Sequence, residues 1–432
     1  MDIAEKQIVI WPRWRKVVFR FLFIYFTLTI TPWAWFDAVP FLPKYYNQLW
    51  AWLVKFGNDH LFHITKVLVY PNGSGDTSYN WAEISLILTL SLAGCIIWSA
   101  ADRGRKNYER LNYWLCVFTR YYLIMTALVY GIIKLYALQM EFPNLHQLAT
   151  PLGDYLPMRL SWQFIGYSTP YQVFSGAMEV VAALLLLYRR TITLGLVTAL
   201  AVFTNVMMLN LCYDIPVKIF SMQLVFICLF LLASDGKRLF DFFILNKPTP
   251  AADNYNFPYR KKYMRIVRVV LKVIFIGYAL CMQIYSSYKE YLDEHPAQTK
   301  SLIKNGLYDV TSFKLNNKLP ALFTADSLAW QDVILENGTG SIKTGDSLFK
   351  MRYSRGYFDY FIDTLNRRMD FKREYKGSVY TILSLHFELP DSNTIKLSGK
   401  RGEDSLKVEL KRSKHHFQLA ERQFHWLSEH NR

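Results

Sequence analysis

Residues 113–140 read YWLCVFTRYYLIMTALVYGIIKLYALQM, and this stretch decides how the rest of the chain is interpreted. A helix of about 20 apolar residues crosses the hydrocarbon core of a bilayer, so the stretch is long enough to do so. It nevertheless carries two positive charges, Arg120 and Lys134. A charge at bilayer depth is costly unless it is paired or reaches water. The stretch therefore predicts a membrane-spanning helix whose charges find partners inside a helical bundle.

Further apolar runs of similar length lie on both sides of this stretch. The mean hydropathy of the whole chain is only +0.08, because the last third is ordinary polar sequence. Hydropathy predicts about seven spans, at residues 17–36, 82–101, 114–138, 168–188, 191–211, 216–234 and 266–286. The first two thirds of the chain are thus expected to form an α-helical polytopic membrane bundle.

Basic residues are distributed unevenly over the segments that connect these spans. With a cytoplasmic N-terminus, the inner segments hold 18 Lys and Arg residues and the outer segments hold 5. The positive-inside rule then places the N-terminus in the cytoplasm and, after an odd number of spans, residues 290–432 outside it, which is the periplasm in a bacterium. The same rule explains most of the net charge of +16, so we expect no nucleic-acid partner.

Residues 1–112 form the first predicted region, with two spans and a connecting amphipathic segment at 45–69. Its apolar residues share one face, so we expect a helix lying in the outer membrane interface. His60 and His63 lie three residues apart there, but two histidines without further ligands are expected to be surface residues. The five cysteines form no CxxC motif, and we predict no metal site.

Residues 290–432 form the third predicted region, which follows a helical region at 113–289. A period of two is clearest at Val379, Thr381, Leu383, Leu385, Phe387 and Leu389. A Pro-Asp-Ser-Asn turn and further alternating segments follow. Alternation with period two is typical of strands with one buried face. The pattern predicts a small, mainly β domain outside the cytoplasm, with a sandwich or barrel-like fold.

Polar residues at similar depth in the spans of the helical region suggest a pocket that opens to the outer side. Lys134 lies in the outer half of its span, and Glu179 near the middle of the next. We expect the pocket to be lined by Lys134, Glu179, Asn205 and Lys218, with Gly131 and Gly176 allowing close helix approach.

The order of these residues resembles a known superfamily. Its anchors here are Arg120, Gly131-Ile-Ile-Lys134, Pro157-Met158, Ser161-Trp162, Glu179, Arg189-Arg190 and Asn205. In residues 113–235 the chain is similar to the four-helix core shared by DoxX-type proteins, HTTM domains (the membrane part of vitamin K-dependent carboxylases) and lipase maturation factors. The resemblance implies a four-helix core, with an extracytoplasmic β domain as in the carboxylases and maturation factors.

The resemblance implies three different functions. DoxX is linked to quinone reduction, the carboxylase deprotonates and oxygenates a reduced quinone, and the maturation factor assists the folding of secreted lipases. The first expectation is redox or proton-transfer chemistry on a quinone-like or other lipid-soluble molecule, with a quinone as the implied cofactor. The alternatives are a non-catalytic envelope factor that handles a lipid, a secreted protein or a membrane protein, and an HTTM carboxylase-like enzyme.

Each candidate residue has a functional and a structural interpretation. Lys134 and Glu179 are the candidate catalytic residues, with Lys134 as a base or anion holder and Glu179 orienting it or carrying a proton. The same pair can simply fix the register of two helices. Six further residues are candidates for substrate binding: Arg120, Arg159, Trp162, Asn205, Asp214 and Lys218.

These six also have structural interpretations. Arg120 can extend to the cytoplasmic interface, and Arg159 with Trp162 can anchor a loop at the outer one. Asn205 can link helices by a hydrogen bond. Asp214 and Lys218 can belong to a tight turn that opens a helix with Pro216 at its first position, where Asp214 lies near the positive end of the helix dipole.

Overall fold

A computed structural model describes residues 10–30, 42–73, 75–250, 262–295, 302–316, 328–347, 349, 351–375, 377–422 and 426–427. The chain divides into two compact units. The helical unit comprises Met1–Met140 and Ser168–Asp293, and the barrel unit comprises Glu141–Tyr167 and Glu294–Arg432. Residues 141–167, expected as a polar loop of the membrane part, thus belong with the β domain.

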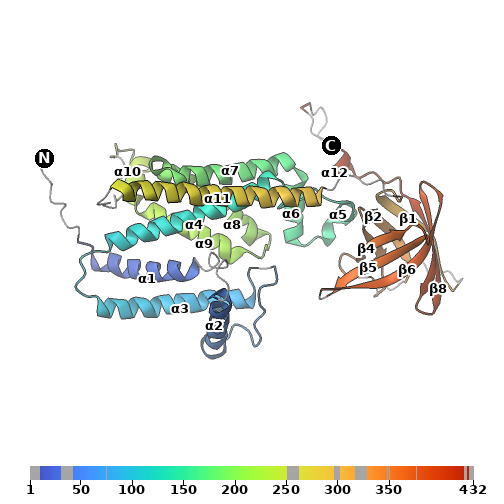
Figure 1. The fold of residues 1–432 in the computed structure, drawn as a ribbon, viewed down its shortest axis with the longest axis horizontal. Helices are drawn as coiled ribbons and strands as arrows, with labels where there is room; N and C mark the ends of the chain where they lie inside the picture. Colours follow the sequence, from blue (N-terminus) through green and yellow to red (C-terminus); the bar gives the residue numbers. More distant parts are fainter. Residues whose placement is uncertain are drawn as a thin grey trace. The chain divides into compact units, whose positions relative to one another are not determined.

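The helical unit is built from helices of different lengths. They are α1 (Arg13–Thr29), α2 (Leu42–Gly57), α3 (Ser78–Ala101), α4 (Glu109–Leu135), α7 (Thr169–Leu187), α8 (Ile192–Cys212), α9 (Lys218–Ala233), α10 (Gly236–Phe243) and α11 (Lys262–Glu294). A π-helical turn, η2 (Asn58–Phe62), extends α2, and a 3-10 turn, η4 (Arg189–Thr191), joins α7 to α8. Figure 1 shows the long helices running in roughly the same direction, with α2 lying across the end of α3.

Helix α4 lies at the centre of the helical core. Leu123, Ile124, Ala127 and Leu128 are all buried. These two adjacent pairs lie four residues apart, about one turn, so all four residues share one face of the helix. Helix α4 packs along α7, α7 along α8, α8 along α9, and α9 returns to α4. Four helices thus surround a common apolar core.

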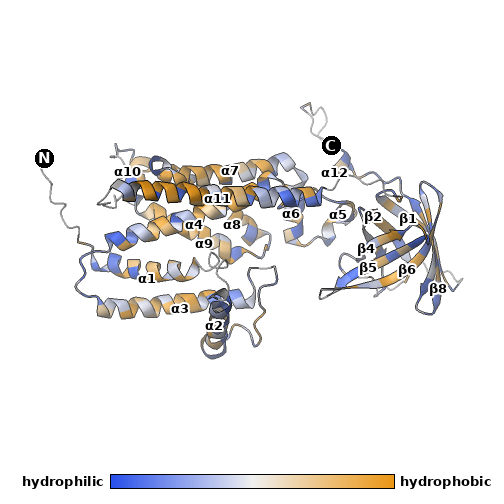
Figure 2. Cartoon of the chain, viewed as in Figure 1, coloured by the Kyte–Doolittle hydropathy of each residue, from blue (hydrophilic) through white to orange (hydrophobic). Residues whose placement is uncertain are grey.

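Several helices are long and apolar enough to cross a membrane. Five meet this test among the described residues, and the bent pair α9 and α10, which meet at 83°, would make a sixth. Figure 2 shows apolar residues along most of α7, α8, α9 and α11. Helix α1 has 17 described residues, and the predicted first span continues beyond them to residue 36. Seven spans and insertion into a membrane remain predictions.

The β domain is a closed barrel of eight antiparallel strands. They are β1 (Gly306–Leu315), β2 (Trp330–Glu336), β3 (Thr339–Thr344), β4 (Arg355–Asp363), β5 (Arg368–Tyr375), β6 (Ser378–Asp391), β7 (Thr394–Arg401) and β8 (Asp404–Arg412). Each strand pairs with its neighbour in sequence, and β1 pairs with β8 to close the barrel. Of the two predicted β architectures, the chain adopts the barrel.

Large side chains fill the interior of the barrel. Trp330, Phe349 and Phe371 are almost fully buried, and the ring of Trp330 contacts the rings of both phenylalanines. Leu383, Leu385 and Phe387 alternate with more exposed neighbours along β6, as the sequence pattern predicted. Val379 and Thr381, at the start of the same pattern, are exposed instead. The short helices α5 (Leu145–Leu148), α6 (Pro157–Tyr167) and α12 (Gln418–Glu421), and the 3-10 turn η3 (Leu152–Asp154), complete the barrel unit.

Candidate functional site

Lys134 and Glu179 form an ion pair inside the helical unit. Lys134 lies in the last turn of α4 and Glu179 in the middle of α7, and their side chains are 8% and 1% exposed. The ammonium Nζ of Lys134 donates to Oε1 of Glu179. The two candidate catalytic residues are therefore in direct contact, well away from solvent.

Two glycines let the backbones of α4 and α7 approach closely beside the pair. A Cβ atom on Gly176 would lie 2.6 Å from the carbonyl oxygen of Gly131 and 2.7 Å from Cβ of Lys134. A Cβ on Gly131 would lie 2.9 Å from the carbonyl oxygen of Gly176. Any side chain at either position would push the helices apart. The predicted close approach at these glycines is confirmed.

The second carboxylate oxygen of Glu179 has no partner among the described residues. Oε2 is buried, and no hydrogen-bond donor of the described chain reaches it. A buried acceptor without a donor costs about 1–3 kcal/mol, and more when it is charged. Oε2 of Glu179 is therefore a buried acceptor that the described chain leaves without a donor.

Gln172 fixes the chain just beyond Lys134. Its side chain is almost fully buried on α7. Its amide Nε2 donates to the carbonyl oxygen of Met140 at 2.6 Å, and its Oε1 accepts from the amide nitrogen of Met140 at 2.9 Å. These two hydrogen bonds hold the segment that follows α4 against α7. The sequence did not point to Gln172, because glutamine in an apolar run gives no specific signal.

Asp214 and Lys218 belong to a second polar group, around the start of α9. Nζ of Lys218 lies 2.7 Å from Asp214 and 3.7 Å from Asp76. The carboxylate of Asp76 accepts from the backbone nitrogens of Lys218 at 2.7 Å and Ile219 at 3.1 Å. Asp76 is therefore the residue that caps α9, which begins at Lys218 and not at Pro216.

Asp214 itself does not occupy the capping position. Its backbone has a φ of 51°, in the left-handed region, and its side chain is 81% exposed. Asp76 was missed because it lies about 140 residues earlier in the sequence, in the loop before α3. Only the tertiary fold brings it to α9.

The remaining candidates in the helical unit lie apart from the ion pair. Asn205 is exposed on the surface of α8. Asn210, five residues further along α8, is buried and donates to the carbonyl oxygen of Val217 at 3.4 Å. Arg120 is half-buried on α4, with its guanidinium 5.8 Å from the ring centroid of Tyr121.

Arg159 and Trp162 lie on α6 and belong to the barrel unit. The expected loop is a helix there, and the guanidinium of Arg159 lies 5.7 Å from the ring centroid of Trp162. The indole nitrogen Nε1 of Trp162 is buried with no partner among the described residues. The two residues are therefore neighbours on one helix.

A polar network inside the barrel unit was not predicted. Nδ1 of His146, on α5, lies 2.8 Å from Oγ of Ser341, which also accepts from Nε of Arg355 at 2.9 Å. Arg355 in turn pairs with Asp332 at 2.5 Å. Ser341 is fully buried and closed to a substrate. The network therefore serves to fasten α5 to strands β3 and β4.

The environment of this network keeps His146 neutral. Burial, and then the positive charge of Arg355, lower the pKa of His146 to about 4. Beside it, Glu336 accepts from the backbone nitrogen of Leu145 at 2.9 Å. Burial raises the pKa of Glu336 more than this hydrogen bond lowers it. Because the imidazole of His146 is neutral, it does not repel the buried guanidinium of Arg355. Helix α5 is therefore held to the strands without a second positive charge.

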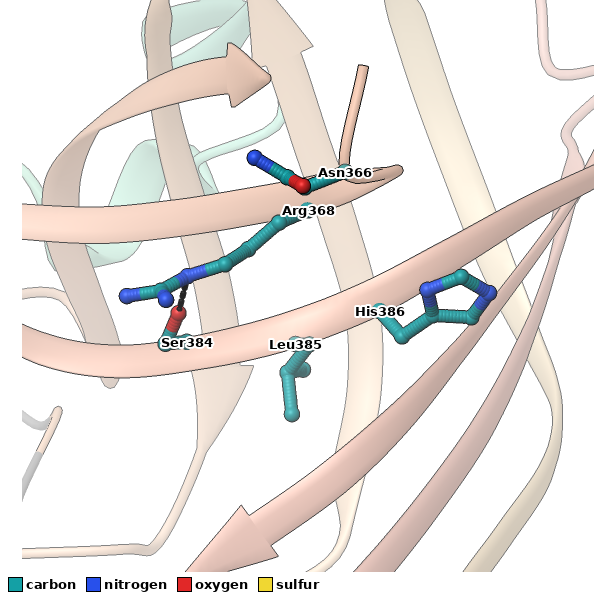
Figure 3. Close-up of a pocket in the computed structure, with 5 residues that line it drawn as sticks. All are labelled: Asn366, Arg368, Ser384, Leu385 and His386. Carbon is teal, nitrogen blue, oxygen red and sulfur yellow. Dashed lines mark hydrogen bonds between the residues drawn. The ribbon is translucent and has the colours of Figure 1, made fainter. Parts of the chain in front are cut away.

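A shallow polar depression of about 330 Å³ lies on the barrel unit. It is lined by Asn366, Arg368, Ser384, Leu385 and His386, and Figure 3 shows Arg368 and Ser384 meeting there. Nε of Arg368 also lies 2.8 Å from Asp370, whose carboxylate accepts from Ser384. The hydrogen bond from Ser384 is the main cause that lowers the pKa of Asp370.

The described part of the chain contains no group of three or more His, Cys, Asp or Glu side chains that could hold a metal ion. His60 and His63 are both exposed, and His60 stacks on Phe56 with ring centroids 4.3 Å apart. Nδ1 of His60 lies 3.0 Å from the carbonyl oxygen of Phe56. Its environment is that of a surface residue.

Comparison with known proteins gives one short similarity. The chain is 39% identical over 84 residues to the uncharacterized protein YwoB of Bacillus subtilis (strain 168). The match covers 19% of this chain and 54% of that protein, so the chain spans about half the length of the curated relative. No protein-family model and no solved structure matches the chain.

Proposed function

We propose that the helical unit is a membrane-embedded site for a lipid-soluble molecule that carries a hydroxyl group, and that a reduced quinone is this molecule. The observation that carries the proposal is the buried, unpartnered Oε2 of Glu179 beside the bound ammonium of Lys134. The resemblance of residues 113–235 to DoxX-type proteins and to the membrane part of the carboxylases supports it. Both are linked to quinones, and the carboxylase acts on the reduced form.

The free oxygen of Glu179 discriminates between the two forms of a quinone. The carbonyl oxygens of an oxidised quinone only accept hydrogen bonds, so they cannot satisfy a second acceptor. A hydroquinone presents hydroxyl groups, which can donate to Oε2. The site therefore favours the reduced form.

The same geometry supports a proton transfer. The O–H bond of the ligand would break, a new O–H bond would form at Oε2 of Glu179, and the negative charge would pass to the ligand oxygen. Lys134 would then face that oxygen with its ammonium group, in a low dielectric where the attraction is strong. Glu179 is the proton acceptor and Lys134 the counter-charge in this proposal.

Titration of the purified protein with a short-tailed hydroquinone and with its oxidised form tests the proposal. We expect the wild-type protein to bind the hydroquinone about tenfold more tightly, which corresponds to one net hydrogen bond of about 1.4 kcal/mol. Glu179→Gln and Lys134→Met should lose the preference, whereas Asn205→Ala, on the exposed face of α8, should keep it.

Equal affinity of the wild-type protein for both forms, or a preference retained by folded Glu179→Gln, would contradict the proposal. Glu179→Gln leaves Lys134 buried with a weaker partner, so the thermal stability of each variant is measured alongside. If Glu179→Gln does not fold, Glu179→Asp supplies the second test. Its shorter side chain keeps the charge but withdraws the oxygen, and the preference should fall.

A second candidate function is that of an envelope factor that binds a secreted or membrane protein through the barrel. The observation in its favour is the polar depression around Arg368, whose side chain is 56% exposed and keeps its terminal nitrogens for a ligand. An acidic peptide should bind there, and Arg368→Gln should weaken binding at least tenfold. Lys411→Gln, at an exposed position on β8, is the control. Equal binding by both variants would remove this candidate.

A further inference from the structure

Four basic residues gather in the helical unit, away from Lys134 and Glu179. We call them the basic cluster: Arg120 on α4, Arg189 on η4, and Arg268 and Lys272 on α11. Arg120 precedes Lys134 by 14 residues, which is about 21 Å along a helix. The cluster is therefore a separate place from the ion pair.

Contacts between helices bring the cluster together. Nζ of Lys272 donates to the carbonyl oxygen of Leu187, the last residue of α7. The rings of Tyr121 and Phe275 lie with their centroids 6.5 Å apart, so α11 also touches α4 next to Arg120. Figure 1 shows α11 running along the length of the unit.

The charges of the cluster repel one another. Arg120 interacts unfavourably with Arg189 and with Lys272, and Lys272 also with Arg268. No carboxylate pairs with Arg120 or Lys272 within the part of the chain that the structure describes. Arg120 and Lys272 are the partly buried members of the cluster. Positive charges that meet where solvation is poor destabilise the fold unless an anion offsets them.

Arg120 also has an unsatisfied donor. Its Nε atom is buried, and no acceptor of the described chain reaches it. A guanidinium binds phosphate through two parallel N–H donors, one of which is commonly Nε. The cluster thus offers both the charge and a free donor for a phosphate group.

We propose that the basic cluster binds the phosphate of an anionic lipid headgroup. The proposal rests on the membrane embedding of the helical unit but not on its hydroquinone site. The flank of the cluster is apolar and open: Val269, Val270 and Leu271 of α11 are exposed next to Arg268. A lipid can place its acyl chains along this flank while its phosphate reaches Arg120 and Lys272. A free phosphate would leave the flank uncovered.

Thermal unfolding of the full chain in detergent, with added lipid, tests this. We expect phosphatidylglycerol to raise the Tm of the wild-type protein by roughly 5 °C at about 100 times its Kd, and zwitterionic phosphatidylcholine to raise it far less. Arg120→Gln and Lys272→Gln should lose the difference between the two lipids. Arg120→Lys, which keeps the charge, should retain part of it.

Lys66→Gln is the matched control, since it removes an exposed positive charge outside the cluster and should leave the lipid preference intact. Arg268→Gln, at an exposed position, provides the test if a more buried variant does not fold. Equal stabilisation by both lipids would overturn the proposal. So would a full effect of inorganic phosphate alone, which would assign the site to a free anion.

Discussion

At the scale of single residues, the stability of the helical core depends on the charged pair Lys134 and Glu179. Each side chain is buried, so each charge depends on the other for its compensation. Removing one partner of a buried pair leaves the charge of the other uncompensated, whereas replacing both partners with apolar residues removes both charges.

A double-mutant cycle on this pair therefore has a defined outcome. We expect Lys134→Met and Glu179→Leu each to lower the free energy of unfolding by about 3–5 kcal/mol, and the double variant to lose much less. Thermal unfolding in detergent measures all four proteins. Losses that simply add in the double variant would show that the two side chains do not interact.

His146 gives a pH dependence at the same scale. Its pKa in the folded barrel unit is about 4, below the ordinary value of 6.5, so the unfolded chain binds more protons between these two values. Stability should therefore rise with pH from about 4 to 6.5 and be lost, by up to roughly 3 kcal/mol, as the pH falls through that range.

The unfolding of the protein at pH 4.5 and pH 7, followed by tryptophan fluorescence, measures this effect. His146→Gln should reduce the difference between the two pH values, because its amide does not titrate. The matched control is His386→Gln, which changes an exposed histidine of β6. An unchanged pH dependence in His146→Gln would assign the effect to other groups.

At the scale of elements, the crossing of α4 and α7 is set by Gly131 and Gly176. The backbone atoms that a Cβ would meet belong to the partner helix and cannot rotate away. This crossing also brings Lys134 and Glu179 together, so packing and ion pairing depend on the same two glycines.

Gly176→Ala should thus destabilise the helical unit by about 1–3 kcal/mol, because the added methyl group overpacks the interface. Gly277→Ala on α11 is the control: nothing lies within 4 Å of its added Cβ, and alanine is the better helix former there by about 1 kcal/mol. Thermal stability in detergent should fall for the first variant and hold or rise for the second. The opposite order would mean that α4 and α7 do not meet at Gly176.

At the scale of the whole molecule, the apolar helices and the barrel imply different surroundings. The positive-inside asymmetry predicts that the loop before α4 faces the cytoplasm and that the barrel lies outside it. Gly104 and Ser378 are exposed positions suited to test these two sides.

Single cysteines at these positions, in a chain whose five native cysteines are replaced, report the topology. In intact cells an impermeant thiol reagent should label Ser378→Cys and spare Gly104→Cys, and both should react after the membrane is opened. The reverse pattern in intact cells would invert the orientation of the whole chain.

The amino-acid sequence by itself determined the elements that depend on local patterns. Apolar runs of bilayer length predicted α3, α4, α7 and α8, and period-two alternation predicted the strands of the β domain, because burial of one face imposes its period on the residues. It also selected Lys134 and Glu179, since a charge in an apolar run needs a partner. Gly131 and Gly176 were selected because glycine lets helices approach closely.

Only the tertiary structure decided which distant residues meet. Asp76 caps α9 from a loop some 140 residues earlier, and residues 141–167 fold with the barrel although they interrupt the helical region. The network of His146, Ser341 and Arg355 joins segments about 200 residues apart. Local periodicity carries no information about such contacts, because they arise from the packing of whole elements and the closure of β1 on β8.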